Sequence, residues 1–178
     1  ENLTKLQCAV KDYQNVYIKT LGQNVGVPGG RNIGIELGTA EYTVSIDNDA
    51  VLESSHGLAN IVRIFESEPE IGIIGFRIMN YYNNKDDEYS WVYPKPLKRK
   101  RDERFLTTTF CGCGHAIRRS VFNQVAGYDA DLFFYWEETD LSYRVINLGY
   151  KIIYEPSIRV LHKISPEARV RWEDRRFY

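Results

Sequence analysis

Apolar and polar residues alternate along this chain with two different periods, and the periods follow one another in order. Residues 42–46 alternate at period two, as in a half-buried strand, and the apolar residues of 58–65 recur at helical spacing. The apolar run at 71–79 has the length and composition of a buried strand. A strand, a helix and a second strand predict a crossover unit, so we expect an α/β fold with a mostly parallel sheet flanked by helices.

The same patterns predict further elements on either side of this unit. Apolar spacing predicts a helix near residues 3–13, and β-branched and aromatic residues predict a strand over 15–21. A glycine-rich loop at 24–30 precedes a short helix from about Arg31. In the second half of the chain we expect strands at 106–110, 150–154 and 158–161, and helices at 119–125 and 137–148.

Composition indicates a single globular domain over residues 1–178 and excludes some classes of partner. With 178 residues, of which 43% are hydrophobic and 26% charged, the chain can bury one sizeable core. A formal net charge of -1 provides no basic face for nucleic acid, which we exclude as a partner. Three cysteines, an odd number, indicate reduced thiols in a cytoplasmic protein. The sequence contains no apolar run of spanning length, so we expect any membrane contact to be peripheral, at the inner face.

A long polar segment interrupts the pattern at about residues 80–104. It is rich in tyrosine, asparagine and charged residues, and it includes the basic run at 98–101. We expect a long surface loop here. Two interpretations stay open for it: a solvated connection without a function, or a flap that touches an anionic substrate.

Two aspartates follow the strand at 42–46 and are the first candidates for chemistry. Asp47 and Asp49 lie at the carboxyl end of a strand, which is where ligands gather in α/β proteins. Paired carboxylates at such a place can hold a divalent metal and the phosphate that the metal carries. Aspartates are also common turn formers, so the pair alone does not establish a site.

A second acidic cluster, Glu137, Glu138 and Asp140, opens the next amphipathic helix. Acids in a first helical turn also complement the helix dipole, and Asp140 is spaced to pair with Arg144. His162 ends the strand-like stretch that follows, and a lone histidine there is either a ligand or a structural residue. Our hypothesis is that both acidic clusters and His162 converge on one pocket.

Blocks of sequence around these residues lie in a fixed order over most of the chain. They are Asn24-x-Gly26-x-x-x-Gly30-Arg31-Asn32-x-Gly34, Asp47-Asn48-Asp49, residues 133–144, Gly149-Tyr150-Lys151 and Val160-Leu161-His162. In order and spacing, these blocks resemble family 2 glycosyltransferases and the GT-A fold of that family. The resemblance implies transfer of a sugar from a nucleotide-diphosphate donor to an acceptor hydroxyl, usually with inversion at the anomeric carbon.

The resemblance also implies a divalent metal, Mn²⁺ or Mg²⁺, that bridges the diphosphate of the donor. Asp47 and Asp49 match the DxD position of the family, with Asp49 as the direct ligand and Asp47 on the metal or the ribose. His162 matches a histidine that supplies a further ligand in some members, and such a donor set suits Mn²⁺. The positions that match the surroundings of the donor are Asn24, Gly30, Arg31 and Asn32.

For catalysis, the resemblance places the general base in the second acidic cluster. The second acid of the family's Glu-Asp motif is the usual base, which corresponds to Glu138, with Glu137 as the neighbouring candidate. Asp140 belongs to the same cluster, and glutamate replaces the commoner aspartate at the base position. The positions that match the region of donor sugar and acceptor are Gly114, His115 and Trp136. From the residues alone, His115 is structural or merely exposed.

The chain departs from the family's pattern at its N-terminal side. The family's domain opens with a strand, a helix and a strand that form the nucleotide-base pocket, whereas this sequence opens in what matches the following helix, so we expect an incomplete sheet. The resemblance leaves three kinds of acceptor open: a saccharide, a lipid-linked oligosaccharide or a protein. Two other functions stay open: a non-catalytic sugar-binding or interaction module, and a sugar-phosphate nucleotidyltransferase.

Overall fold

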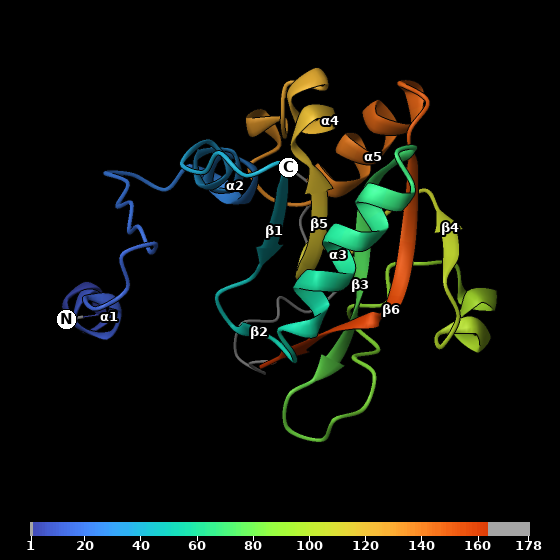
Figure 1. The fold of residues 1–178 in the computed structure, drawn as a ribbon, viewed down its shortest axis with the longest axis horizontal. Helices are drawn as coiled ribbons and strands as arrows, with labels where there is room; N and C mark the ends of the chain where they lie inside the picture. Colours follow the sequence, from blue (N-terminus) through green and yellow to red (C-terminus); the bar gives the residue numbers. More distant parts are fainter. Residues whose placement is uncertain (1, 164–178) are drawn as a thin grey trace, which may run out of the picture.

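The structure of the protein is a computed structural model that describes residues 2–163, and it has the expected α/β class (Figure 1). The strands are β1 (Tyr42–Ile46), β2 (Ala50–Leu52), β3 (Ile71–Asn80), β4 (Phe105–Thr107), β5 (Gly114–Arg118) and β6 (Lys151–His162). The α-helices are α1 (Asn2–Val10), α2 (Gly26–Glu36), α3 (His56–Ser67), α4 (Arg119–Gln124) and α5 (Glu137–Asn147), and the 3₁₀-helices are η1 (Lys95–Lys100) and η2 (Ala130–Leu132). Within residues 2–163, no helix has both the length and the apolar character needed to cross a bilayer.

The strands form a mixed sheet in which β1, β5, β3, β6 and β2 are neighbours in that order and β4 pairs with β6. Because β5 is antiparallel to both β1 and β3, the latter two run in the same direction, as their crossover through α3 requires. β3 and β6 pair in parallel, whereas β2 and β4 run antiparallel to β6. The prediction of a mostly parallel sheet was therefore wrong for the described residues. Apolar periodicity reports which side chains are buried, but it does not report strand direction, and β5 is inserted between two parallel strands.

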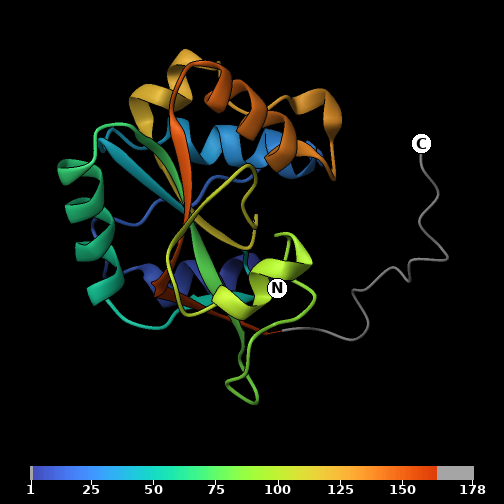
Figure 2. The same cartoon turned by 90° about the vertical axis from the view of Figure 1, so that its right-hand side faces the viewer.

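Alternate residues of the central strands pack into two cores, one on each face of the sheet. In β3, Ile74 contributes to the core under α3, and its neighbour Ile73 contributes to the core under α2, α4 and α5. Ile153 and Ile152 of β6 divide in the same way. Figure 2 shows the green α3 on one side of the sheet, with the blue α2 and the gold-to-orange α4 and α5 on the other. Burial on both faces explains why β3 is a continuous apolar run.

The predicted helix of the crossover unit is α3, and an arginine from a neighbouring strand completes its C-terminal end. Ile61, Ile64 and Phe65 form the buried face of the helix. Arg118, at the end of β5, donates from Nη2 to the carbonyl of Phe65 at 2.6 Å and from Nε to the carbonyl of Ile71 at 3.2 Å. These hydrogen bonds satisfy a carbonyl that the end of the helix would otherwise leave unpaired.

The N-terminal part of the chain differs from the predictions in two ways. The strand predicted over residues 15–21 is absent, and none of the described strands pairs with this segment. In addition, α1 lies away from the sheet (Figure 1). The predicted loop at 24–30 is helical from Gly26, where α2 begins. Gly26 has a φ of 72°, and a Cβ there would lie 2.2 Å from the carbonyl oxygen of Phe133. This glycine therefore permits the close approach of two backbone segments.

β6 joins the two strands predicted on either side of Pro156 into one strand. Its register against β3 shifts at this point, since Phe76 pairs with Glu155 and the next residue, Arg77, pairs with Arg159. Proline has no N–H to donate to a strand ladder, so it is accommodated at an irregularity of this kind. The shift allows β6 to continue along β3 to the far edge of the sheet.

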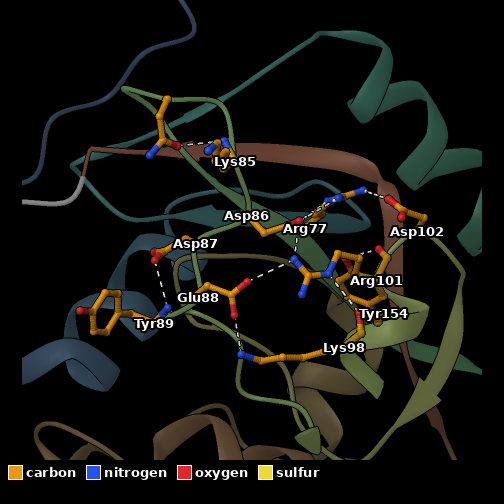
Figure 3. A network of polar contacts seen from close by, with 11 residues as sticks. Arg77, Lys85, Asp86, Asp87, Glu88, Tyr89, Lys98, Arg101, Asp102 and Tyr154 are labelled. Atoms are coloured by element: carbon orange, nitrogen blue, oxygen red, sulfur yellow. Dashed lines mark hydrogen bonds and ion pairs between the residues drawn. The ribbon is translucent and has the colours of Figure 1, made fainter. Parts of the chain in front are cut away.

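The segment between β3 and β4 crosses the surface, and charged side chains hold it against β3 (Figure 3). Arg77 of β3 donates to the two carboxylate oxygens of Asp86, from Nε at 2.7 Å and from Nη2 at 3.0 Å. Arg101, from the other end of the segment, donates to the same carboxylate at 2.8 Å. The hydrogen bonds with Asp86 are the first cause of the raised pKa of Arg77. Asp86 thus ties both ends of the segment to the sheet.

Candidate active site

Pairing between β2 and the end of β6 brings Asp49 beside His162. Ala50 lies directly opposite His162 in the register of these strands, and the N–H of Lys163 donates to the carbonyl of Asp49 at 2.7 Å. Oδ2 of Asp49 is 3.4 Å from Nε2 of His162. Two residues that are far apart in the sequence thus face each other at one edge of the sheet.

The other aspartate of the pair, Asp47, faces a different partner. Its N–H donates to the carbonyl of Cys113 at 3.2 Å, which fixes the backbone where β1 ends. Its Oδ1 accepts a hydrogen bond from Nη2 of Arg31 at 3.1 Å. Asp47 and Asp49 therefore lie in the same turn but hold separate partners, one in α2 and one at the end of β6.

Arg31 of α2 connects the two acidic clusters. Nη1 donates to Oε1 of Glu138 at 2.9 Å, and Oε1 of Glu137 lies 3.5 Å from the same nitrogen. Nη2 donates to Asp47 and also to the carbonyl of Gly112 at 3.0 Å. A single guanidinium thus joins carboxylates at the end of β1 and at the start of α5.

The surroundings of Arg31 keep it charged. Burial by itself would lower the pKa of Arg31, but the phenol of Tyr128 and the carboxylates of Glu138 and Asp47 raise it well above its usual value. The side chain is only 12% exposed, so these interactions are screened little by water. Arg31 is therefore a fixed cation that holds mutually repelling carboxylates near one another.

The two glutamates of the second cluster differ in exposure. The side chain of Glu138 is 20% exposed, whereas that of Glu137 is 4% exposed. Oε2 of Glu137 has no hydrogen-bond partner among the described residues. Burial, and after it the neighbouring carboxylate of Glu138, raise the pKa of Glu137. Of the two carboxylates, that of Glu138 is the one that solvent and a substrate can reach.

Asp140 makes the ion pair that its spacing predicts. Its Oδ2 accepts a hydrogen bond from Nε of Arg144 at 3.0 Å, and Nη1 of Arg144 donates to the carbonyl of Gly127 at 2.7 Å. Among the described contacts, Asp140 makes none with Arg31. The structure therefore separates Asp140 from the other acids of its cluster and gives it a role in fixing the turn before η2.

Three of the residues predicted to contact a ligand, Asn32, His115 and Gly114, are engaged by Tyr128 or buried in the core. Asn32 donates from Nδ2 to the carbonyl of Tyr128 at 2.8 Å and accepts the N–H of Tyr128 at 2.9 Å. The hydroxyl of Tyr128 lies 2.7 Å from Nε2 of His115, which is fully buried, and burial lowers the pKa of His115 to about 3. Gly114 is also buried, and a Cβ there would lie 2.8 Å from Val160. Against the expectation for the acceptor region, neither Gly114 nor His115 is exposed to a ligand, because both belong to the inner strand β5.

Trp136, the third residue expected near the acceptor, is exposed and ends a run of four exposed aromatic residues that begins at Phe133. Phe133, Tyr135 and Trp136 have positive φ angles of 55°, 72° and 70°, a strained conformation for residues other than glycine. The segment is fixed to α2, since the N–H of Val27 donates to the carbonyl of Phe133 at 2.8 Å. These rings form an exposed aromatic surface immediately before Glu137 and Glu138.

The start of α2 borders an open groove. Oδ1 of Asn24 accepts the N–H of Gly26 at 3.0 Å, a turn that begins the helix. The groove has a volume of about 850 Å³ and runs between α2 and β1, where its lining includes Gly30, Arg31 and Asp47. Gly30 and Arg31 thus lie on a surface that a ligand can reach, and Asn24 lies just before it.

Two residues of the site were not singled out from the sequence. A Cβ at Gly112 would lie 1.9 Å from Oε1 of Glu138, so only glycine leaves room for that carboxylate. Oδ2 of Asp87, from the segment after β3, lies 3.0 Å from Nδ1 of His162. The tight Cys-Gly-Cys turn was a signal for Gly112, but Asp87 lies in a polar segment where nothing distinguishes it from its neighbours.

Asp49 and His162 are the residues that fit a divalent metal. Oxygen and imidazole nitrogen are suitable donors, and two ligand bonds of about 2.1 Å at a right angle place donor atoms about 3 Å apart, near the 3.4 Å found here. The predicted set of three does not gather, because Asp47 is bound to Arg31. Within residues 2–163, no three His, Cys, Asp or Glu side chains form a group that could hold a metal.

Comparison with solved structures defines the class of fold. The structure matches GalNAc-T7 with UDP, GalNAc and Mn²⁺ over 90% of this chain and 35% of that one, with a TM-score of 0.72 and 19% identity. It matches the mannosyltransferase PcManGT from Pyrobaculum calidifontis, in complex with GDP-Man and Mn²⁺, over 93% of this chain and 45% of that one, with a TM-score of 0.69 and 16% identity. The chain therefore has the GT-A fold of these glycosyltransferases, as its sequence predicts.

The sequence profile described as Glycosyl transferase family 2 matches residues 3–126, and the chain belongs to this family. It is 24% identical to the glucosyl-dolichyl phosphate glucuronosyltransferase of Haloferax volcanii over 92% of this chain and 56% of that protein. A stretch of 46 residues, 26% of this chain, is 46% identical to the N-acetylglucosaminyl-diphospho-decaprenol L-rhamnosyltransferase of Mycobacterium tuberculosis, where it covers 15%. The chain spans about half the length of the first of these relatives.

Proposed function

We propose that this chain transfers a sugar from a nucleotide-diphosphate donor to an acceptor hydroxyl. The observation that carries the proposal is the position of Arg31, which lines an open groove and whose guanidinium joins Asp47 to Glu138. A donor lying in this groove would place its diphosphate beside a fixed cation and its sugar toward the carboxylate of Glu138, which is partly exposed. Membership of the family, and relatives solved with UDP or GDP-Man and Mn²⁺, support this class of reaction.

Glu138 is the proposed general base. A sugar hydroxyl is a poor nucleophile, so a positioned carboxylate takes its proton while the oxygen attacks the anomeric carbon, an effect typically worth about 10² to 10⁴ in rate. As that bond forms, the bond between the anomeric carbon and the diphosphate breaks, and direct displacement of this kind inverts the anomeric carbon. The hydrogen bond from Arg31 and the greater exposure of Glu138 favour it over Glu137.

Asp49 and His162 are the residues that would hold Mn²⁺ or Mg²⁺. Bound there, the ion would act as a Lewis acid for the negative charge that develops on the departing diphosphate. The guanidinium of Arg31 would stabilise the same negative charge on the diphosphate, since it lies next to Asp47 in the groove. Trp136 provides an exposed aromatic face on which a pyranose ring can stack beside Glu138.

A lipid-linked saccharide is the acceptor that the comparisons favour. One relative is named for a dolichyl phosphate and another for a diphospho-decaprenol, although each is only partly covered by this chain. A protein that acts on such an acceptor would meet the membrane at its surface, which is consistent with the peripheral contact expected from the sequence. Polysaccharide and protein acceptors are the other outcomes of an acceptor screen.

Turnover of nucleotide sugars by the intact protein tests the proposal. In a panel of UDP-, GDP- and dTDP-sugars with Mn²⁺, we expect release of the nucleoside diphosphate from at least one donor, its loss on addition of EDTA, and its return with excess Mn²⁺. Glu138→Gln should bind the donor with an affinity near that of the wild type, but its rate should be about 10²- to 10⁴-fold lower.

Glu70→Gln is the matched control for this substitution. Glu70 is exposed and pairs with Lys151 outside the candidate site, so its neutral variant should keep the wild-type rate. Ordinary turnover by Glu138→Gln would contradict the assignment of the base. Donor binding without release for every sugar in the panel would favour the non-catalytic module instead.

A further inference from the structure

His162 lies where three segments of the chain meet at one edge of the sheet. In the strand registers, it is opposite Ala50 on one side and opposite Asn80 on the other. The N–H of Tyr81 also donates to the carbonyl of His162 at 2.9 Å, so the backbone is fixed from the β3 side. The orientation of the ring is then decided by what its two nitrogens contact.

Both ring nitrogens of His162 face a carboxylate. Nε2 lies 3.4 Å from Asp49, and Nδ1 lies 3.0 Å from Oδ2 of Asp87. The side chain of Asp49 is 42% exposed, whereas that of Asp87 is 1% exposed. One side of the ring is thus open to a ligand, and the opposite side is closed by a buried acid.

The carboxylate of Asp87 is itself held in place. The hydroxyl of Ser90 donates to Oδ2 at 2.5 Å, and the N–H of Tyr89 donates to Oδ1 at 3.1 Å. The N–H of Asp87 donates to the carbonyl of Ile78 at 3.0 Å, which anchors the segment to β3. With both of its oxygens engaged, this carboxylate has one orientation available, and it presents that orientation to His162.

The chemistry of the two groups decides which ring nitrogen carries the proton. An ionised carboxylate can only accept hydrogen bonds, and a neutral imidazole has one N–H. The buried carboxylate of Asp87 at Nδ1 therefore requires a proton on Nδ1, so Nε2, which lies beside the more exposed Asp49, is the nitrogen that remains for a metal. A metal-ligating imidazole almost always has a fixed acceptor of this kind behind the ring, which sets the tautomer and the angle of the ring.

We propose that Asp87 is a positioning residue of the metal site, which holds His162 with Nδ1 protonated and Nε2 turned toward Asp49. The inference rests on the proposed function, because the metal and the donor are what Asp49 and His162 would hold. The segment between β3 and β4 would then contribute to the metal site through Asp87. The adjacent Asp86 ties the same segment to Arg77 and Arg101 (Figure 3).

The test is NMR of the intact protein labelled with ¹⁵N-histidine and titrated with Mn²⁺ alone. The chain has three histidines, so the exposed His56 and the buried His115 serve as references in the same spectrum. In the wild type, we expect ring shifts of a protonated Nδ1 for His162 and selective broadening of its signals by Mn²⁺. Loss of the assigned signals in His162→Gln identifies them.

Asp87→Asn keeps the size of the side chain but can offer an N–H to the ring. We expect His162 to lose its single tautomer and the Mn²⁺ concentration for half broadening to rise about 10- to 100-fold. Asp102→Asn is the matched control: its carboxylate belongs to the same segment, is 78% exposed and contacts Arg77, so both readouts should stay as in the wild type. The unfolding midpoint of each variant, measured in the same samples, separates loss of the tautomer from loss of the fold.

Three results would overturn the inference. The first is a wild-type ring with its proton on Nε2, which is measured without any variant and therefore holds even if Asp87→Asn does not fold. The second is wild-type Mn²⁺ broadening together with an unchanged tautomer in folded Asp87→Asn. The third is a wild-type His162 that Mn²⁺ does not broaden. Nucleotide-sugar turnover in the same preparation then shows whether the proposed function survives, because turnover with an unbroadened His162 removes the metal role of His162 and the positioning role of Asp87 but leaves the transfer reaction.

Discussion

At the scale of single residues, this site depends on side chains that are small or buried as much as on its acids. Gly112 shows the point, because its carbonyl accepts from Arg31 while its missing side chain leaves space for the carboxylate of Glu138. A Cβ at this position would lie 1.9 Å from Oε1 of Glu138 and 2.8 Å from Nη2 of Arg31. Both atoms are at the far ends of flexible side chains, so a methyl group would move the site rather than unfold the protein.

Gly112→Ala should therefore reduce sugar transfer much more than stability. We expect the rate to fall about 100-fold, since a displacement of about 1 Å at a catalytic group costs that much, while the unfolding midpoint stays near that of the wild type. Denaturant unfolding and nucleoside diphosphate release measure the two effects. Gly22→Ala is the control, because a Cβ at Gly22 would have no atom within 4 Å. A wild-type rate for Gly112→Ala would show that Glu138 does not need its present position.

At the scale of elements, α2 is connected to the turn before η2 by hydrogen bonds as well as by apolar contacts. The amide of Asn32 pairs with both the N–H and the carbonyl of Tyr128, much as a neighbouring strand would. Tyr128 then contacts His115 of β5 through its hydroxyl. This chain of contacts fixes the helix that carries Arg31 relative to the strand that carries the Gly112 turn.

Asn32→Ala should destabilise the protein by about 1 to 3 kcal/mol, because it leaves an N–H and a carbonyl of Tyr128 without their partners in a part-buried place. Urea unfolding of the variant measures this cost. Asn123→Ala, at an exposed position of α4, should unfold within about 0.5 kcal/mol of the wild type. If Asn32→Ala unfolds like the wild type but binds the donor weakly, Asn32 is a ligand of the donor, as the family resemblance implies, and not a structural clamp.

At the scale of the whole molecule, hydrogen bonds tie the segment from β3 to β4 both to the sheet and to the candidate metal site. Asp86 holds Arg77 and Arg101, and the adjacent Asp87 reaches His162 on the other side of the segment. The basic run at 98–101 left open a flap that touches an anionic substrate. Two of its residues, Lys98 and Arg101, form ion pairs with Glu88 of the same segment. The same short stretch thus joins the sheet, the surface segment and the candidate metal site.

Asp86→Ala should loosen this segment without opening the core. We expect amide hydrogen exchange at residues 81–104 to become roughly tenfold to a hundredfold faster, which corresponds to the loss of about 1.5 to 3 kcal/mol from hydrogen bonds to charged groups. Exchange in β3 and β6 should stay slow. Asp102→Asn removes a more exposed partner of Arg77 and should change exchange much less. Unchanged exchange in Asp86→Ala would show that other contacts hold the segment.

Local patterns in the sequence were sufficient to single out most of the acidic residues of the candidate site. Asp47 and Asp49 were recognisable because they follow an alternating strand, and Glu137 and Glu138 because they open an amphipathic helix. The burial of Gly114 and His115 was not recognisable, since a five-residue strand inserted between two others has no distinctive period. Asp87 was missed for a related reason, because one aspartate in a polar segment carries no local signal of burial.

The sequence by itself determined the kinds of elements, their order, the family, and the ends of strands and helices at which the acids lie, because these depend on interactions within a few residues. Only the tertiary structure decided which acids share a partner. The pairing of Arg31 with Glu138 is set by the packing of α2 and α5 on one face of the sheet, and that of His162 with Asp49 is set by strand register. Register and strand order arise from packing between distant segments, and a pattern along one segment contains no information about which partner it will meet.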